Sequence, residues 1–412
     1  MRLPFMPFGS RPLSKQKPLM KGSDVRRLQQ VLKYLGFFNA RIDGVFGYDT
    51  FSAVKEFQRF FNIKSKGIVD EEDYSVLREL MAVGINKWHM IQRDYAHSGN
   101  SPVPVPIKLK KCWARRIPDI IGLNCSADRL IVTTRQEVIS FDFKGSRLWK
   151  SKEIFPVAVS TISEGQVFVP AHQLTVLDIY SGKIQSNLKQ DTFILPVTAK
   201  AGHIYAPSQG TLYAFNPKGS TIWQYKTAGA YCTSPAIGFD LIYFASFDKY
   251  IYCLDEKGLL YWKTKVSDII ENHLALWEGM VFAISRDSWI IALNPLTGKI
   301  IWQKKFFDEE LKMPAFHKDF MLIVNNKGEA SALSLQRAEI RWVVDLPSVP
   351  TTDPIICKDA FFVGTEEGLL AYDMRSLKFY KYLENKKISA VIPGNMGVFV
   401  ATDQELIRLS RE

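Results

Sequence analysis

The chain has 412 residues, of which 47% are apolar, 13% aromatic and 23% charged. This composition excludes a mostly disordered protein, and the length is sufficient for more than one folded domain. The 53 Lys and Arg against 42 Asp and Glu give a net charge of +11, and no run approaches the roughly 18 apolar residues that a membrane-spanning helix needs.

Residues 1–21 carry five positive charges and no acid, and their apolar stretch Leu3–Phe8 is broken by Pro4 and Pro7. A signal peptide needs a continuous apolar segment of about 7–15 residues, so none is predicted. We expect a basic, flexible tail, which is either a solvated leader or an arm that touches an anionic surface.

Residues 22–84 show apolar positions at helical spacing in three segments, separated by the turn signals Asp43-Gly44 and Lys66-Gly67. The periodic apolar residues are Val25, Leu28, Val31, Leu32 and Leu35, then Phe51, Val54, Phe57 and Phe61, then Tyr74, Leu77 and Leu80. Ser23 and Gly36 are suited to cap the first helix. The pattern predicts a small three-helix bundle.

The same stretch resembles the peptidoglycan-binding domain of bacterial wall hydrolases. The positions that match the family pattern are Gly22, Asp24, Val25, Leu28 and Gln29, then Asp43, Gly44, Phe46, Gly47 and Thr50, then Ala53, Val54, Phe57 and Gln58. A second Asp-Gly-x-x-Gly-x-x-Thr element of the family is reduced to KGIVDEEDY here. The resemblance implies that the domain binds peptidoglycan.

Aromatic and polar residues beside the matched positions are the candidates for contact with peptidoglycan: Tyr34, Arg41, Asp43, Phe46 and Tyr48. For each of them, packing within the domain is the alternative role. We expect Gln29 and Gln58 to tie helices to loops by hydrogen bonds.

Residues 85–108 end in a Ser-Pro-Val-Pro-Val-Pro run, which is typical of a semi-rigid spacer. The first half contains Trp88, His89 and Met90, so we expect it to pack on the domain that follows. Residues 85–108 are therefore predicted to be a Pro-rich linker.

The remaining sequence repeats. An Asp, Asn or Ser ends a β-rich run, a tight turn follows, and a Trp comes seven or eight residues later in the clearest copies, such as YCLDEKGLLYW. The turn positions are 142, 178, 216, 255, 294, 334 and 373, which are 36–40 residues apart. About 40 residues is the length of one four-stranded propeller blade.

The two ends of this region each supply an incomplete unit. Trp113 lies on a fourth strand with no third strand before it, and Leu406–Ser410 is a third strand with no fourth strand after it. We expect residues 110–116 to pair with residues 405–410, because closure removes exposed sheet edges. The predicted fold is a three-helix bundle followed by an all-β eight-bladed propeller with four-stranded antiparallel blades over residues 109–412.

The Asp-x-x-x-Gly-x-x-x-Trp signature and the preceding WHMIQRDYAHSG resemble the pyrroloquinoline-quinone-like propeller repeat over roughly residues 88–412. That family holds quinone-dependent dehydrogenases, outer-membrane assembly lipoproteins and non-enzymatic scaffolds, so the resemblance implies the fold rather than an activity. The dehydrogenases require a vicinal disulfide, and the five cysteines here include no Cys-Cys pair. We predict no enzyme, no catalytic residue and no cofactor.

The chain has six histidines: His89, His97, His172, His203, His273 and His317. Registered against the repeat, the last four fall at different heights and faces of the expected blades. No shared metal site is predicted from them. The five cysteines form no CxxC, and we expect most to be small buried hydrophobes.

One face of the propeller should collect the loops between blades and the turns between second and third strands. Its candidate binding residues are Tyr231, Phe247, Lys249, Arg286, Trp289 and Lys327. This mixed aromatic and basic face either contacts an acidic protein or a glycan, or consists of ordinary solvated turns.

We interpret the chain as a bacterial, non-enzymatic, monomeric scaffold that is bound to peptidoglycan and has an unidentified protein or glycan partner at the propeller face. No nucleic acid, metal or transmembrane segment is predicted. The alternatives are an enzyme that acts on wall polysaccharide through the propeller channel, and an intracellular scaffold. The helical domain implies the cell wall or another extracytoplasmic location, whereas the lack of a visible signal peptide leaves the cytoplasm open.

Overall fold

The computed structural model describes residues 6, 8–34, 37–38, 40–60, 63–83, 88–101, 103–126, 128–188, 193–216, 218–306, 310–394 and 397–411. The chain divides into two compact units. The first is Met1–Asn86 with Pro102–Pro104, and the second is Lys87–Ser101 with Val105–Glu412.

The first unit contains the three predicted helices, α1 (Ser23–Tyr34), α2 (Tyr48–Phe60) and α3 (Glu71–Val83). The apolar residues at helical spacing form its core, including Val25, Leu28, Leu32, Val54, Phe57, Tyr74 and Leu77. The predicted cap Gly36 lies outside the described residues, as do Leu35, Phe61 and the side chain of Leu80. Within the described chain, none of the helices has the length and apolar character needed to cross a membrane.

The described part of the basic tail packs on this unit, which differs from the flexible tail predicted from its charge and prolines. Leu13 is fully buried and exchanges two backbone hydrogen bonds, of 3.0 and 2.8 Å, with Val69. Arg11 Nε lies 2.7 Å from Asp24 Oδ2, and the Asp24 side chain is fully buried. The physical reason for the difference is that a buried carboxylate requires a partner, which the tail supplies.

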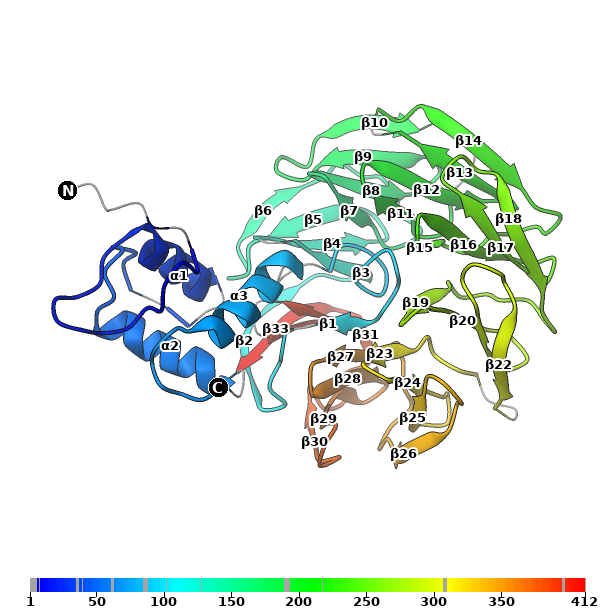
Figure 1. Ribbon diagram of the computed structural model, residues 1–412. Helices are drawn as coiled ribbons and strands as arrows, with labels where there is room; N and C mark the ends of the chain where they lie inside the picture. The colour runs from blue at the N-terminus through cyan, green and yellow to red at the C-terminus, as the bar shows by residue number, and fades with distance from the viewer. Residues whose placement is uncertain are drawn as a thin grey trace. The chain divides into compact units, whose positions relative to one another are not determined.

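The second unit is a propeller of eight sheets arranged in sequence around an axis (Figure 1), each built from four antiparallel strands, with one additional parallel strand on one of them. The prediction of eight four-stranded blades is confirmed. The first four blades, from inner to outer strand, are β3 (Ile120–Cys125), β4 (Leu130–Thr134), β5 (Val138–Phe141) and β6 (Arg147–Lys150); β7 (Thr161–Ser163), β8 (Gln166–Pro170), β9 (Leu174–Asp178) and β10 (Ile184–Leu188); β11 (Thr198–Lys200), β12 (His203–Ser208), β13 (Thr211–Phe215) and β14 (Thr221–Lys226); and β15 (Ala236–Gly238), β16 (Leu241–Ser246), β17 (Tyr250–Asp255) and β18 (Leu260–Lys265).

The next three blades are β19 (Ala275–Trp277), β20 (Met280–Ile284), β21 (Trp289–Leu293) and β22 (Ile300–Lys305); β23 (Ala315–His317), β24 (Phe320–Val324), β25 (Glu329–Ser334) and β26 (Ile340–Asp345); and β27 (Ile355–Cys357), β28 (Ala360–Thr365), β29 (Gly368–Asp373) and β30 (Phe379–Tyr382). The last blade joins the two ends of the region: β31 (Ile388–Gly394), β32 (Gly397–Thr402), β33 (Glu405–Arg411) and, outermost, β2 (Leu109–Arg116). In this closing blade, Lys111 is paired with Leu409 and Trp113 with Arg408.

Tryptophans on five of the outer strands join a blade to the next one. Their indole N–H groups donate to backbone carbonyls of the following blade at 2.6–3.1 Å: Trp113 to Phe143, Trp149 to Ile179, Trp223 to Glu256, Trp262 to Pro295, and Trp302 to Leu335. For Trp113, Trp149, Trp223 and Trp262, the repeat glycine of the following blade lies against the ring. A Cβ at Gly298, which has a φ of +66°, would come within 2.5 Å of the Trp262 ring. The Gly and Trp of the repeat therefore meet between neighbouring blades rather than within one blade.

We call residues 88–101 the lead-in segment. It crosses the inner strands of the propeller, and its end, β1 (Asn100–Ser101), adds in parallel to β27. Its carbonyls accept backbone N–H groups from five inner-strand positions, the last of them on β27 itself, at 2.6–3.0 Å: His89 from Ile162, Tyr95 from Ile237, Ala96 from Leu276, Ser98 from Phe316, and Gly99 from Ile356. The first half of the predicted linker is thus part of the propeller, because its backbone groups pair with the inner strands.

Candidate functional site

A buried glutamine fixes the loop that carries the candidate peptidoglycan contacts. Gln29 on α1 donates from Nε2 to Asp43 Oδ1 (2.8 Å) and to the Val45 carbonyl (3.1 Å). Its Oε1 accepts from the backbone N–H groups of Asp43 (3.1 Å) and Gly44 (2.8 Å). Gln58 on α2 holds the following turn in the same manner. Both glutamines therefore tie helices to loops, as predicted.

Three of the five candidates on this unit are exposed: Arg41, Asp43 and Tyr48. Tyr48 is 67% exposed, and Lys15 Nζ from the tail lies 5.0 Å from its ring centroid. Partial burial acts to raise the pKa of the Asp43 carboxyl, but hydrogen bonds from Gln29 and from loop amides outweigh it and lower that pKa. The loop thus presents an aromatic ring, two cations and an ionised carboxylate.

The other two candidates are not available for contact in the same way. Phe46 is fully buried, so the prediction that its ring contacts a ligand is wrong; the ring completes the core beneath the loop. Tyr34 is the last residue of α1, and its side chain lies outside the described residues.

The structure brings four of the six candidates on the propeller face together. The rings of Tyr231 and Phe247 meet edge to face with centroids 5.4 Å apart. Lys249 Nζ and Arg286 Nε both pair with Asp268, at 2.9 and 3.2 Å, and these contacts lower the pKa of Asp268, with the Lys249 hydrogen bond as the largest cause. Asp268 therefore already partly neutralises the two cations, whereas the two rings make no ion pair and offer an aromatic surface on this face.

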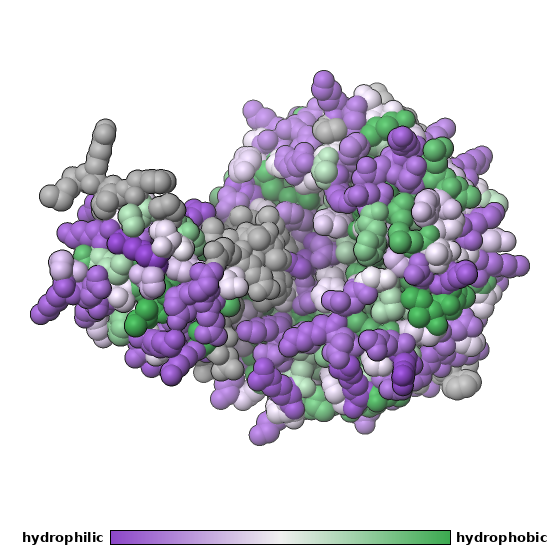
Figure 2. All heavy atoms as spheres, viewed as in Figure 1, coloured by the Kyte–Doolittle hydropathy of each residue, from purple (hydrophilic) through white to green (hydrophobic). Residues whose placement is uncertain are grey.

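The remaining two candidates lie farther along the same set of turns. Trp289 begins β21, is half-buried and packs against the hydrophobic cluster between neighbouring blades. Lys327 is exposed in the turn between β24 and β25, the equivalent turn of the next blade. In the view of Figure 2, hydrophilic residues cover most of the propeller surface and hydrophobic residues form smaller areas between them.

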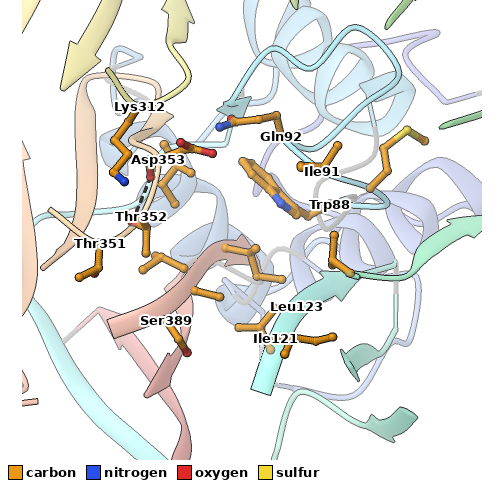
Figure 3. Close-up of a pocket in the computed structure, with 17 residues that line it drawn as sticks. Trp88, Ile91, Gln92, Ile121, Leu123, Lys312, Thr351, Thr352, Asp353 and Ser389 are labelled. Carbon is orange, nitrogen blue, oxygen red and sulfur yellow. Dashed lines mark hydrogen bonds between the residues drawn. The ribbon is translucent and has the colours of Figure 1, made fainter. Parts of the chain in front are cut away.

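A pocket near the axis of the propeller was not predicted from the sequence. We call it the axial pocket; its volume is about 270 Å³. Figure 3 shows Lys312, Asp353 and Gln92 along one side and Ile121 and Leu123 along the opposite side. The other residues that line it are Trp88, Met90, Ile91, Gly122, Val159, Thr351, Thr352, Ile355, Ser389, Ala390, Val391 and Ile392. They come from the lead-in segment, from β3, β27 and β31, and from the segments before β7, β23 and β27.

Asp353 is the acidic group of the axial pocket. Burial raises its pKa, and this effect outweighs hydrogen bonds from the Met313 backbone and the Gln92 side chain together with the field of Lys312. The Met313 N–H donates to Asp353 Oδ1 at 3.0 Å. Gln92 Oε1 is buried and has no hydrogen-bond partner in the part of the chain that the structure describes.

Two histidines pack together beside the lead-in segment. The rings of His97 and His273 have centroids 4.6 Å apart, and His97 Nδ1–H donates to the Leu274 carbonyl at 2.8 Å. Burial lowers the pKa of both, that of His97 to about 4, so both are neutral at pH 7. Among the described residues, no group of three or more His, Cys, Asp or Glu is placed to hold a metal ion.

The cysteines are free, and all but Cys112 are buried. Burial raises the pKa of the Cys125 and Cys253 thiols to about 12 and that of Cys232 to about 11. Because a thiolate is the nucleophilic form, these buried side chains act as small hydrophobes.

In comparisons with known proteins, the two units match different families. Residues 21–77 match the family of peptidoglycan binding domains, and residues 208–412 match the family described as outer membrane protein assembly factor BamB. The helical part is similar to the spore cortex-lytic enzyme of Halalkalibacterium halodurans, with 47% identity over 51 residues, which is 12% of this chain and 16% of that enzyme. The chain spans less than a third of the length of the curated relatives that it matches.

Solved structures resemble the propeller. BamB from Moraxella catarrhalis has a TM-score of 0.63 and 16% identity, covering 74% of this chain and 98% of that protein. The quinohemoprotein alcohol dehydrogenase from Comamonas testosteroni has a TM-score of 0.65 and 13% identity, covering 83% of this chain and 82% of the enzyme. At these identities the likeness shows the fold alone, and it includes both an assembly factor and an enzyme.

Proposed function

For a chain that joins a peptidoglycan-binding domain to a propeller of pyrroloquinoline-quinone-like repeats, we propose the function of a wall-associated, non-enzymatic scaffold. In this proposal the helical unit binds peptidoglycan and the propeller presents a surface to a protein or glycan. The match of residues 21–77 to the peptidoglycan binding domains carries the proposal. It implies that the protein is found in the cell-wall or envelope fraction.

We assign glycan contact to the loop that Gln29 fixes. Tyr48 offers a ring for stacking on a sugar, and Arg41 offers a cation for peptide or lactyl carboxylates. Both side chains are exposed. The loop needs no rearrangement to present them, because the hydrogen bonds of Gln29 already fix its backbone.

We assign partner binding on the propeller to the Tyr231–Phe247 ring pair, flanked by Lys249 and Arg286. Since Asp268 already pairs with both cations, contact through the rings is favoured over simple attraction of an acidic surface. Ring contacts suit a sugar face or an apolar side chain of a protein partner.

Sedimentation of the full chain with purified sacculi tests the proposal. We expect the protein to pellet with the wall, and Tyr48→Ala combined with Arg41→Ala to reduce the bound fraction about tenfold. The control is Tyr180→Ala, which removes a tyrosine that is 68% exposed on the propeller. A wild-type chain that stays in the supernatant would contradict wall binding.

A second arm of the same experiment tests the propeller face. Sacculus-bound protein is exposed to envelope extract, and co-captured material is compared between wild type and Tyr231→Ala/Phe247→Ala. Material that wild type and Tyr180→Ala capture, and that Tyr231→Ala/Phe247→Ala does not capture, supports the assignment. Capture that is identical for all three proteins counts against it.

A further inference from the structure

We propose that the axial pocket binds an amino-acid end group, which carries an ammonium and a carboxylate on one carbon and an apolar side chain. The pocket has a cation and an anion on one side and an apolar surface on the other (Figure 3). A ligand that is neutral overall but doubly charged at one end matches this division.

Lys312 supplies the cation. Its only ion pair among the described residues is with Glu310, at 3.9 Å, and that carboxylate is 73% exposed. A long, exposed pair of this kind contributes little, so the ammonium is free to take a ligand carboxylate. The backbone of Lys312 is fixed, because its N–H donates to the Val324 carbonyl at 2.8 Å.

Asp353 supplies the anion. A carboxylate has about four acceptor positions, and here one is used by the Met313 N–H and another by the Gln92 side chain. No ion pair between Lys312 and Asp353 is present within the described structure. The two charges therefore stand apart at a partly enclosed surface, where a bound ammonium and carboxylate would satisfy both.

The apolar side of the pocket is the part that contacts the apolar side chain of the ligand. Ile121, Leu123, Val159 and Val391 line it, and Trp88 from the lead-in segment also lines the pocket. The volume of about 270 Å³ is far above the roughly 10–15 Å³ that a single water molecule needs, so the pocket has room for an amino-acid end group.

Two sources share this end-group chemistry. One is a free apolar amino acid, and the other is the uncrosslinked side-chain end of a diamino acid in a wall peptide. The second source rests on the proposed wall function, whereas the first does not.

Isothermal titration calorimetry on the full chain tests the inference with three probes. L-leucine carries both charges, N-acetyl-L-leucine carries only the carboxylate, and L-leucinamide carries only the ammonium. We expect leucine to bind at least about tenfold more tightly than either blocked compound, because each charged hydrogen bond contributes separately. No binding of leucine at about 10 mM, or equal affinity for all three probes, would overturn the inference.

Charge-removing variants assign the two groups. Lys312→Met should weaken the binding of L-leucine and N-acetyl-L-leucine at least about tenfold and leave the binding of L-leucinamide unchanged. Asp353→Asn should weaken the binding of L-leucine and L-leucinamide and leave the binding of N-acetyl-L-leucine unchanged. The matched controls, Lys299→Met and Asp240→Asn, change exposed residues away from the pocket and should change nothing. If the pocket variants weaken all probes equally, they act through folding rather than charge, and the inference is wrong.

A muropeptide with an uncrosslinked diaminopimelate distinguishes the sources. Tighter binding of this peptide than of leucine identifies the wall, and tighter binding of leucine identifies a free amino acid. The sacculus test depends on the helical unit, so failure of wall binding would leave the leucine result standing.

Discussion

Gln29 makes five hydrogen bonds from one buried side chain: to Asp43 Oδ1, the Val45 carbonyl and Thr50 Oγ1, and from the N–H groups of Asp43 and Gly44. Its amide offers both donors and acceptors, which is why a carboxylate or an aliphatic group of similar size cannot replace it. The peptidoglycan-binding motif therefore includes Gln29 for loop geometry rather than for ligand contact.

Replacing Gln29 with Met should destabilise the helical unit by about 2–4 kcal/mol, because the Asp43 and Gly44 N–H groups lose their acceptor. Urea unfolding followed by circular dichroism at 222 nm measures this, since all three described helices lie in the first unit. The control is the exposed neighbour Gln30→Met, expected within about 0.5 kcal/mol of wild type. Equal midpoints for the two variants would contradict this role.

At the scale of the elements, five of the contacts between neighbouring blades pair a large apolar side chain on an outer strand with a glycine of the next blade. Trp262 donates to the Pro295 carbonyl and its ring covers Gly298. In the blade that ends in β10, which has no Trp, Leu188 takes the equivalent position against Gly219. In these five contacts, an apolar side chain faces a residue without Cβ.

Gly298→Ala should destabilise the propeller more than Gly279→Ala. Both glycines have positive φ, +66° and +74°, so both substitutions cost about 1–2 kcal/mol in backbone strain. A Cβ at Gly298 also meets the Trp262 ring, adding about 1–3 kcal/mol, whereas nothing lies within 4 Å of a Cβ at Gly279. Tryptophan fluorescence measures the difference, because all nine tryptophans lie from residue 88 onward. Equal losses of stability in the two variants would show that the Trp262 ring moves aside at no cost in free energy.

The repeat spacing was sufficient to predict eight blades, because turn residues 36–40 residues apart, with a Trp after most of them, mark the blades locally. The axial pocket could not be predicted in this way. Its lining comes from segments as far apart as Trp88, Gly122, Lys312, Asp353 and Val391, and none of them carries a local signal. Likewise, the ion pair between Arg11 and Asp24 could not be predicted, because nothing in the sequence shows that Asp24 is buried. The aromatic character of WHMIQRDYAHSG was the one available sign that the lead-in segment is buried.

At the scale of the whole molecule, the propeller is closed by strands from its two ends. β33 contributes Leu406, Ile407 and Leu409 to the core, and all three are buried. Their burial contributes about 5–9 kcal/mol, which is comparable with the entire stability of an ordinary domain.

A chain ending at Asp403 lacks β33 and leaves both β2 and β32 with open edges. We expect the cooperative unfolding transition of the tryptophan signal to disappear, and the protein to associate through the exposed edges. Fluorescence-monitored denaturation and sedimentation velocity measure the two effects. A truncated chain with the wild-type midpoint would show that seven blades suffice.

The lead-in segment has a mechanical consequence. It lies in the chain between the helical unit and β2, and its hydrogen bonds reach inner strands of six blades. If the helical unit is held at a fixed surface, tension on the chain reaches these bonds before it reaches the β2–β33 pair. These bonds therefore take the load first, and the β2–β33 pair that closes the ring is shielded from it.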